Sequence, residues 1–186
     1  KIKTPKILEE ILENKAKEVA ARKIKISIQD LKEIDYMSSL KRDFKGALIN
    51  KINQNKDAVI AEIKRASPSM GELNMNIIPA KVASDFEAMG AACLSVLTDA
   101  KYFKGSGAIL EMAKKGCGLP ILRKDFIIDE YQIDESVTMG ADCILLIVSA
   151  LEKNLMKKLY DAAKQRDLDI IVEVHDHSEL EAALEI

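Results

Sequence analysis

Five short runs of aliphatic residues constrain the fold of this chain more than any other feature. Each run is bounded by glycine, proline or charged residues, and each is too short for an ordinary helix. Continuous apolar runs of this kind indicate strands that are buried on both faces, as in a parallel sheet. The runs cover residues 58–63, 93–97, 119–122, 143–148 and 169–174.

Helical patterns separate these runs. They cover residues 79–89, 108–114, 131–139 and 154–165, and a further pattern begins at Ser178. The strands therefore recur roughly every 25 to 35 residues, which is typical of repeated βαβ units with right-handed crossovers. The sequence predicts an α/β protein.

The first third of the chain has helical and polar sequence patterns in place of short apolar runs. Apolar residues recur at helical spacing over 8–20, behind Thr4 as a cap and Pro5 at the first helical position. Polar, irregular sequence follows to about Leu40, and a second helical pattern covers 44–52. We expect residues 1–56 to form a helical extension and residues 57–186 to form β/α units one to five of a single domain.

The order of elements fits both a doubly wound sheet and a barrel. A doubly wound nucleotide-binding fold would place a glycine-rich turn after the first strand, but residues 64–69 read KRASPS. Charged residues instead follow several strands, and barrel enzymes draw their catalytic groups from several strand ends. We therefore favour a partial (β/α)₈ TIM barrel.

Strand parity brings four of these charges to one face. Glu62 and Lys64 are two residues apart, and Lys124 and Glu173 stand at the ends of the third and fifth runs. A single charge beyond a strand is usually solvated. Four at matching heights indicate a functional cluster, in which neighbouring charges separate acid and base roles.

The overall composition excludes some partners. The 186 residues carry 28 basic and 30 acidic side chains, interspersed along the chain, for a net charge of −2. This balance favours neither nucleic acid nor an anionic membrane, and the longest apolar run is too short to span a bilayer. The N-terminus shows no secretory pattern, and the three cysteines lack metal-site spacing, so we expect a cytoplasmic protein.

Five motifs in order resemble those of the indole-3-glycerol-phosphate synthases, and the resemblance covers the whole chain. The helical N-terminal segment also fits that family. The motifs are AEIKRASPS (61–69), LTDAKYFKGS (97–106), PILRKDFIID (120–129), LLIV (145–148) and VEVH (172–175).

The resemblance implies a carboxy-lyase of tryptophan biosynthesis. Its substrate would be 1-(2-carboxyphenylamino)-1-deoxyribulose 5-phosphate, and ring closure with loss of carbon dioxide and water would give indole-3-glycerol phosphate. Lys124 would be the general acid that protonates the ketone, and Lys64 would hold anionic groups and assist proton transfer. Glu173 would act in the later deprotonation and dehydration, with Glu62 supporting it electrostatically.

The resemblance also implies a substrate pocket. Phe103 and Phe126 would form apolar walls for the aromatic ring, and Ser67 would make a polar contact. We expect no metal and no organic cofactor, because protonation and charge stabilisation supply the catalysis. His175 and His177 are expected to be loop or helix-entry residues, since no further ligands at metal-site spacing are visible.

The chain departs from the family pattern in one respect. The family barrel has eight strands, whereas this sequence shows five and ends within the helix that follows the fifth. We expect an incomplete barrel, and a molecule that stops at Ile186 should not bind the substrate phosphate normally and should have little activity. The alternatives are an inactive fragment that self-associates through open sheet edges, or another phosphosugar barrel such as phosphoribosylanthranilate isomerase.

Overall fold

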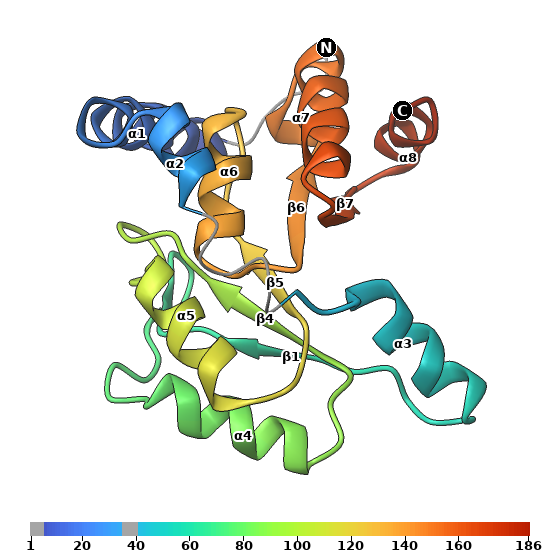
Figure 1. The fold of residues 1–186 in the computed structure, drawn as a ribbon. Helices are drawn as coiled ribbons and strands as arrows, with labels where there is room; N and C mark the ends of the chain where they lie inside the picture. Colours follow the sequence, from blue (N-terminus) through green and yellow to red (C-terminus); the bar gives the residue numbers. More distant parts are fainter. Residues whose placement is uncertain (1–5, 35–40) are drawn as a thin grey trace.

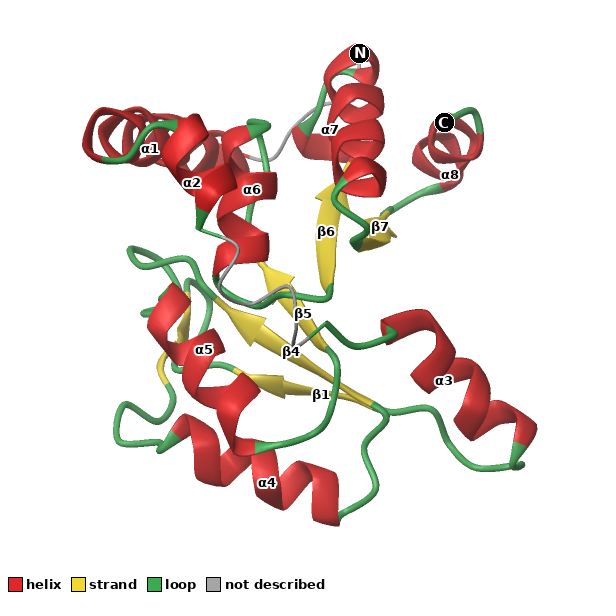
Figure 2. Cartoon of the chain, in the orientation of Figure 1, coloured by secondary structure: helices red, strands yellow, loops and turns green. Residues whose placement is uncertain are grey.

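The protein is built on a five-stranded parallel sheet with strand order β1-β4-β5-β6-β7 (Figures 1 and 2). The computed structural model describes residues 6–34 and 41–186. The predicted α/β fold is confirmed, and the sheet with its helices is a partial TIM barrel. The strands are β1 (Ile60–Ile63), β4 (Cys93–Leu97), β5 (Ile121–Lys124), β6 (Cys143–Ile147) and β7 (Asp169–Glu173).

Helices cover the outer face of the sheet. Alternate residues of β4 and β6, such as Leu94 and Ile144, face outward and are fully buried against the helices. Their apolar side chains pack against Ala83, Leu110 and Leu159. The helices are α4 (Pro79–Ala88), α5 (Gly107–Gly116), α6 (Tyr131–Thr138), the 3₁₀ turn η2 (Val148–Ala150), α7 (Lys153–Gln165) and α8 (His177–Leu184).

In the described residues three helices precede β1, and α1 and α2 lie at one end of the sheet while α3 lies at the other (Figure 1). They are α1 (Lys6–Lys25), α2 (Ile28–Glu33) and α3 (Phe44–Asn53). Helix α2 corrects the prediction of irregular sequence up to Leu40: Ser27 and Asp30 form a capping box that starts this short helix. Thr4 and Pro5 lie outside the described residues, and the division at residues 56 and 57 stays a prediction.

Helix α3 closes the end of the sheet where the strands begin. Phe44 is buried against Cys93 and Cys143, the first residues of β4 and β6. Burial raises the pKa of the Cys93 thiol to about 12, with the carboxylates nearby adding to the effect. These cysteines are therefore core residues, as predicted from their apolar surroundings.

A buried ion pair lies at the same end of the sheet. Lys114 Nζ is 2.7 and 2.5 Å from the two carboxylate oxygens of Asp142, and both side chains are fully buried. Asp142 also accepts hydrogen bonds from the backbone N–H groups of Arg42 (2.7 Å) and Ile121 (2.8 Å). The pair thus joins α5, the segment before α3, and the starts of β5 and β6.

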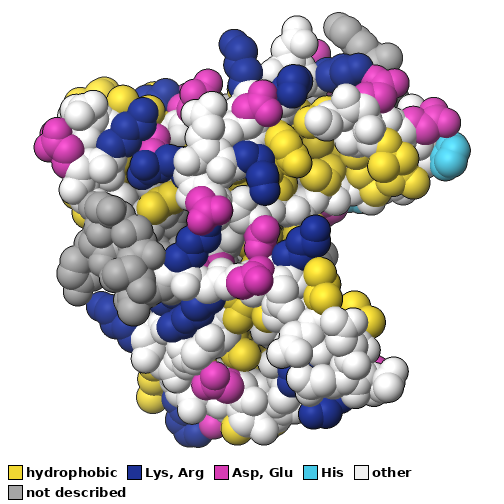
Figure 3. Space-filling model, turned by 45° about the vertical axis from the view of Figure 1, so that its right-hand side comes forward, with side chains coloured by type: hydrophobic (Ala, Val, Ile, Leu, Met, Phe, Trp, Pro, Cys, Tyr) yellow, Lys and Arg dark blue, Asp and Glu magenta, His cyan; other side chains and the backbone are white. Residues whose placement is uncertain are grey.

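The inner face of the sheet is open among the residues that the structure describes. Strands β1 and β7 each pair on one side only, in agreement with the expected open edges. A cavity of 420 Å³ follows this inner face. Figure 3 shows the corresponding hollow between the part of the molecule that carries α8 and the part that carries α3, with apolar side chains above it.

Candidate active site

The four predicted charged residues meet around one cavity at the carboxyl ends of the strands. This cavity has a volume of 210 Å³. Parallel strands bring their carboxyl ends to the same edge, so residues from β1, β4, β5, β6 and β7 reach it together. Its lining comprises Glu62, Lys64, Leu97, Phe103, Lys124, Asp125, Phe126, Leu145, Ile147 and Glu173.

Strand parity accounts for this convergence. The 420 Å³ cavity on the inner face is lined by Glu62 from β1, Lys124 from β5 and Glu173 from β7. The residues two positions earlier in these strands, Ile60, Leu122 and Ile171, line the same cavity. The predicted sharing of faces is therefore confirmed.

Glu62 is the electrostatic centre of the cluster. Its carboxylate oxygens lie 3.0 Å from Lys64 Nζ and 3.6 Å from Lys124 Nζ, and Ser95 Oγ donates a hydrogen bond to it at 3.3 Å. Partial burial alone would raise the pKa of Glu62, but the hydrogen bond from Lys64 and the charges of both lysines outweigh it. The net effect lowers the pKa, so Glu62 is a carboxylate at neutral pH and both lysines sit beside a fixed negative charge.

The two lysines remain accessible from the cavity. The Lys64 and Lys124 side chains are 32% and 37% exposed, and the Glu173 side chain is 35% exposed. A ligand in the cavity could therefore reach two ammonium groups and a second carboxylate. Such a set can donate protons, bind anions and accept a proton.

Two aromatic rings form the apolar side of the cavity. Phe103 lies in the loop after β4 and Phe126 in the loop after β5, and their ring centroids are 6.2 Å apart at an interplanar angle of 39°. Leu97 and Ile147 add aliphatic surface. The cavity therefore offers an apolar wall beside a cluster of charges, a combination that suits a substrate with an aromatic ring and anionic groups.

Ser67 is not among the residues that line this cavity. It ends β2 (Ala66–Ser67), which pairs with β3 (Gly71–Glu72) in a small hairpin after β1. Its Oγ accepts a hydrogen bond from the backbone N–H of Met70 at 3.2 Å and lies 3.4 Å from Ser69 Oγ. The hydroxyl thus serves the local turn, and its predicted contact with substrate stays a prediction.

The histidines lie at the entrance to α8. His177 begins that helix, and the backbone N–H of His175 donates a hydrogen bond to Glu179 at 2.7 Å. In residues 6–34 and 41–186 no three His, Cys, Asp or Glu side chains are placed to hold a metal ion. The positions of the histidines, His175 before α8 and His177 at its first residue, are the loop and helix-entry positions predicted.

The segment KGSG (104–107) forms the turn into α5. Ser106 is the N-cap and its side chain accepts a hydrogen bond from the backbone N–H of Ile109. Gly105 lies so close to β4 that an added Cβ would be 2.2 Å from the Leu97 carbonyl oxygen and 2.9 Å from Thr98 Cα. This glycine lets the loop that carries Phe103 pack directly on the end of β4.

Sequence reasoning missed a buried network beside the cavity. Lys15 of α1 lies between Asp99 and Asp125, and Arg123 contacts both Asp125 and Glu135. One signal could have revealed it. Lys15 stands four residues after Ile11 and four before Val19, so it interrupts the apolar stripe that faces the protein.

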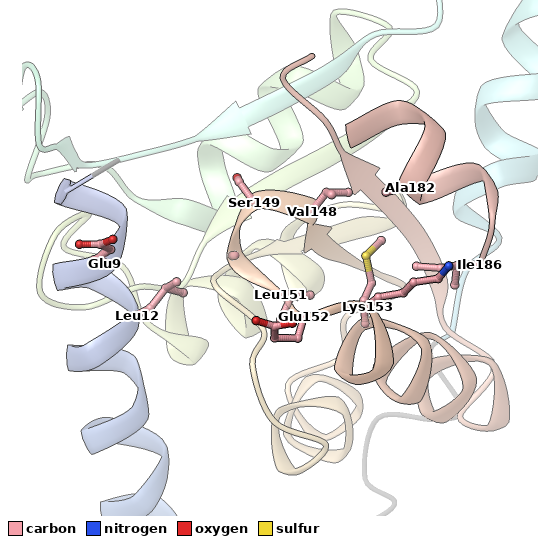
Figure 4. Close-up of a pocket in the computed structure, with 11 residues that line it drawn as sticks. Glu9, Leu12, Val148, Ser149, Leu151, Glu152, Lys153, Ala182 and Ile186 are labelled. Atoms are coloured by element: carbon pink, nitrogen blue, oxygen red, sulfur yellow. The ribbon is translucent and has the colours of Figure 1, made fainter. Parts of the chain in front are cut away.

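A larger cavity of 540 Å³ lies between α1 and the segment from η2 to α8 (Figure 4). Glu9 and Leu12 border it from α1, and Glu152 and Lys153 border it from the opposite side (Figure 4). Lys153 is already paired with Glu185. The 210 Å³ cavity is therefore the better candidate for chemistry, although it is smaller, because it gathers both lysines and both carboxylates.

A family model and a solved structure match this chain. None of the helices in the part of the chain that the structure describes is both long and apolar enough to cross a membrane. A solved structure, that of methylornithine synthase, shares 13% sequence identity with a TM-score of 0.49, and the match covers 86% of this chain and 60% of that one. The family model for indole-3-glycerol phosphate synthase matches residues 8–186. The chain therefore belongs to the indole-3-glycerol phosphate synthase family.

Proposed function

We propose that the 210 Å³ cavity performs ring closure of 1-(2-carboxyphenylamino)-1-deoxyribulose 5-phosphate to indole-3-glycerol phosphate, with loss of carbon dioxide and water. One observation carries the proposal: two lysines, two phenylalanines and the carboxylates of Glu62 and Glu173 converge from four strand ends on one cavity in a chain of this family. The reaction needs a proton donor, a proton acceptor and a site for an aromatic ring, and each has a candidate there.

Lys124 is the proposed general acid. Attack of the electron-rich ring on the ketone places negative charge on the ketone oxygen, and an ammonium group donates a proton to it. Lys124 ends β5, a strand whose register with β4 is fixed by backbone pairing, so its position is set by the sheet. The aromatic ring of the substrate would lie against Phe103 and Phe126.

Lys64 and Glu173 are proposed to carry out the remaining anion binding and proton transfers. Lys64 would bind an anionic group of the substrate and assist proton transfer, because its side chain reaches the same cavity from β1. Glu173 lies across the inner face on β7 and would accept the proton in the later deprotonation and dehydration. Glu62, held ionised between the lysines, would stabilise the positive charge that develops on the substrate nitrogen.

The test is formation of indole-3-glycerol phosphate, followed by its fluorescence, with a chain of verified mass. We expect slow but measurable turnover by the wild type, and a further loss of about 10²–10⁴-fold in kcat for Lys124→Ala, the usual contribution of a general acid. Lys81→Ala is the matched control, because it removes an exposed lysine from α4, where Lys81 pairs only with Asp85 one turn on.

Three results would count against the proposal. Turnover at the wild-type rate in both Lys124→Ala and Lys81→Ala would show that Lys124 is not the acid. Equal loss in both variants would point to damage unrelated to the cavity. Absence of turnover above the uncatalysed rate in the wild type would show that this chain does not perform the reaction.

A further inference from the structure

A buried lysine of α1 holds together the two loops that border the cavity. Lys15 is 1% exposed. Its Nζ lies 2.8 Å from Asp99 Oδ2 and 2.9 Å from Asp125 Oδ1, and 3.0 Å from Glu18 Oε2 on its own helix. Asp99 follows the end of β4 and Asp125 follows the end of β5, so one ammonium group bridges both loops.

Asp99 shapes the loop that carries Phe103. Its Oδ1 accepts a hydrogen bond from the backbone N–H of Tyr102 at 2.8 Å, and its carbonyl oxygen accepts one from the N–H of Gly105 at 2.7 Å. These two bonds enclose Phe103 within the turn. Asp99 is fully buried, so its side chain has little freedom to move once Lys15 holds the second oxygen.

Asp125 has the same role for Phe126. Its Oδ1 accepts a hydrogen bond from the backbone N–H of Phe126 at 2.8 Å, and its Oδ2 accepts one from Thr98 Oγ1 at 2.6 Å. The Thr98 backbone N–H also donates to the Lys124 carbonyl at 3.1 Å. Asp125 therefore fixes the backbone between Lys124, at the end of β5, and Phe126, in the loop that follows.

We infer that Lys15 is a positioning residue for the proposed reaction, which ties the loops after β4 and β5 together so that Phe103 and Phe126 form a fixed wall beside Lys124. The inference rests on the proposed function for its catalytic consequence. Lys15 itself does not line the cavity, so it acts through Asp99 and Asp125.

Electrostatics explains why a cation is needed at this place. Asp99 and Asp125 are 0% and 3% exposed, and two buried carboxylates on one cation repel each other when that cation is removed. Burial would raise the pKa of Asp125, but the charges of Arg123 and Lys15 outweigh it and hold the pKa below its ordinary value. When Lys15 is removed, Asp125 still has its ion pair with Arg123 at 3.2 Å, but the cation that joins Asp125 to Asp99 is lost.

The experiment compares Lys15→Met with Lys23→Met. Both changes remove one lysine from α1, but Lys23 pairs with Asp129 at the surface, where its side chain is 44% exposed. Amide hydrogen exchange of the wild type and both variants is followed at Tyr102 and Phe126, whose N–H groups bond the two aspartates. We expect about tenfold or greater acceleration at both amides in Lys15→Met and none in Lys23→Met.

Kinetics supply a second measurement that a general loss of stability would not reproduce. Because the loops carry the aromatic wall while Lys124 stays in the sheet, Lys15→Met should raise KM about tenfold, comparable to a lost apolar contact, and change kcat much less.

Lys15→Met combined with Asp99→Asn restores the net charge of the network. It is expected to recover part of the protection at Phe126, and it provides a folded variant if the single change unfolds the chain.

The outcomes separate the two proposals. Exchange at Tyr102 and Phe126 that is the same in Lys15→Met as in Lys23→Met overturns the inference, whatever the turnover. A tenfold fall in the kcat of Lys15→Met with an unchanged KM also overturns the inference. Faster exchange in Lys15→Met, with no lyase turnover even in the wild type, supports the tie between the loops while the proposed function fails.

Discussion

Replacing Lys114 by methionine tests what holds the amino end of the sheet. Methionine nearly matches the length of the lysine side chain, so the change removes a charge and little volume. It leaves Asp142 fully buried with its two backbone N–H donors but without the two contacts of 2.7 and 2.5 Å from Lys114. Burial already raises the pKa of Asp142 above its ordinary value, against the attraction of Lys114.

The expected loss follows from these contacts. Removing one partner of a buried ion pair destabilises a protein by about 3–5 kcal/mol, because the other charge is left without compensation. The backbone bonds from Arg42 and Ile121 remain, so we expect the lower end, about 3 kcal/mol at pH 7. For a domain of this size that loss lowers Tm by roughly 10 °C.

The same variant has a defined pH dependence. The folded-state pKa of Asp142 rises further when Lys114 is absent, whereas the unfolded value stays near 3.8. The folded state then binds the proton more tightly than the unfolded state, so stability decreases as the pH rises between these two values. The difference between wild type and variant should therefore be larger at pH 7 than at pH 5.

The measurement is urea unfolding of the wild type, Lys114→Met and Lys81→Met at both pH values. Lys81 pairs with Asp85 at the surface of α4, so its removal should change stability by about 0.5 kcal/mol or less. A loss below about 1 kcal/mol in Lys114→Met would refute the reasoning from buried charge. An equal loss at pH 5 and pH 7 would refute the assignment of the effect to ionised Asp142.

Two further predictions concern packing and association. Gly105→Ala should destabilise the chain by about 1–3 kcal/mol in thermal unfolding, since the added methyl group would meet the Leu97 carbonyl at 2.2 Å, and stability equal to wild type would show that the loop adapts. The unpaired edges of β1 and β7 predict that the mass measured by light scattering rises with protein concentration, whereas a constant monomer mass would contradict self-association through these edges.

The sheet and the cluster of charges could be predicted because both depend on short-range pattern. β6 is buried along its whole length, so its apolar run is continuous and unambiguous. Glu62 and Lys64 share a face through strand parity alone, and the parallel order then brings Lys124 and Glu173 to the same edge. None of these steps requires knowledge of a side-chain contact.

The ionic networks could not be predicted in the same way. Lys15 looks like an exposed helix residue, because lysine in a helix usually is one, and its partners Asp99 and Asp125 are far away in the sequence. Ala16 and Ala20 belong to the apolar pattern predicted over residues 8–20, but both are exposed. The buried stripe is centred on Ile11, Lys15 and Val19, and the helical spacing of Lys15 marks it as buried without identifying its distant partners.

Helix α1 is joined to parts of the chain that are synthesised much later. Lys23 and Asp129 are separated by 106 residues, and Tyr131 reaches the Ile26 carbonyl across 105. A lone polar helix gains most of its stability from packing, so α1 can complete its contacts only after Asp125, Asp129 and Tyr131 have been synthesised. Closing so long a loop is slow relative to forming βα units. Among the described helices, we therefore expect α1 to be fixed in place late, and the wall beside Lys124 to be completed with it.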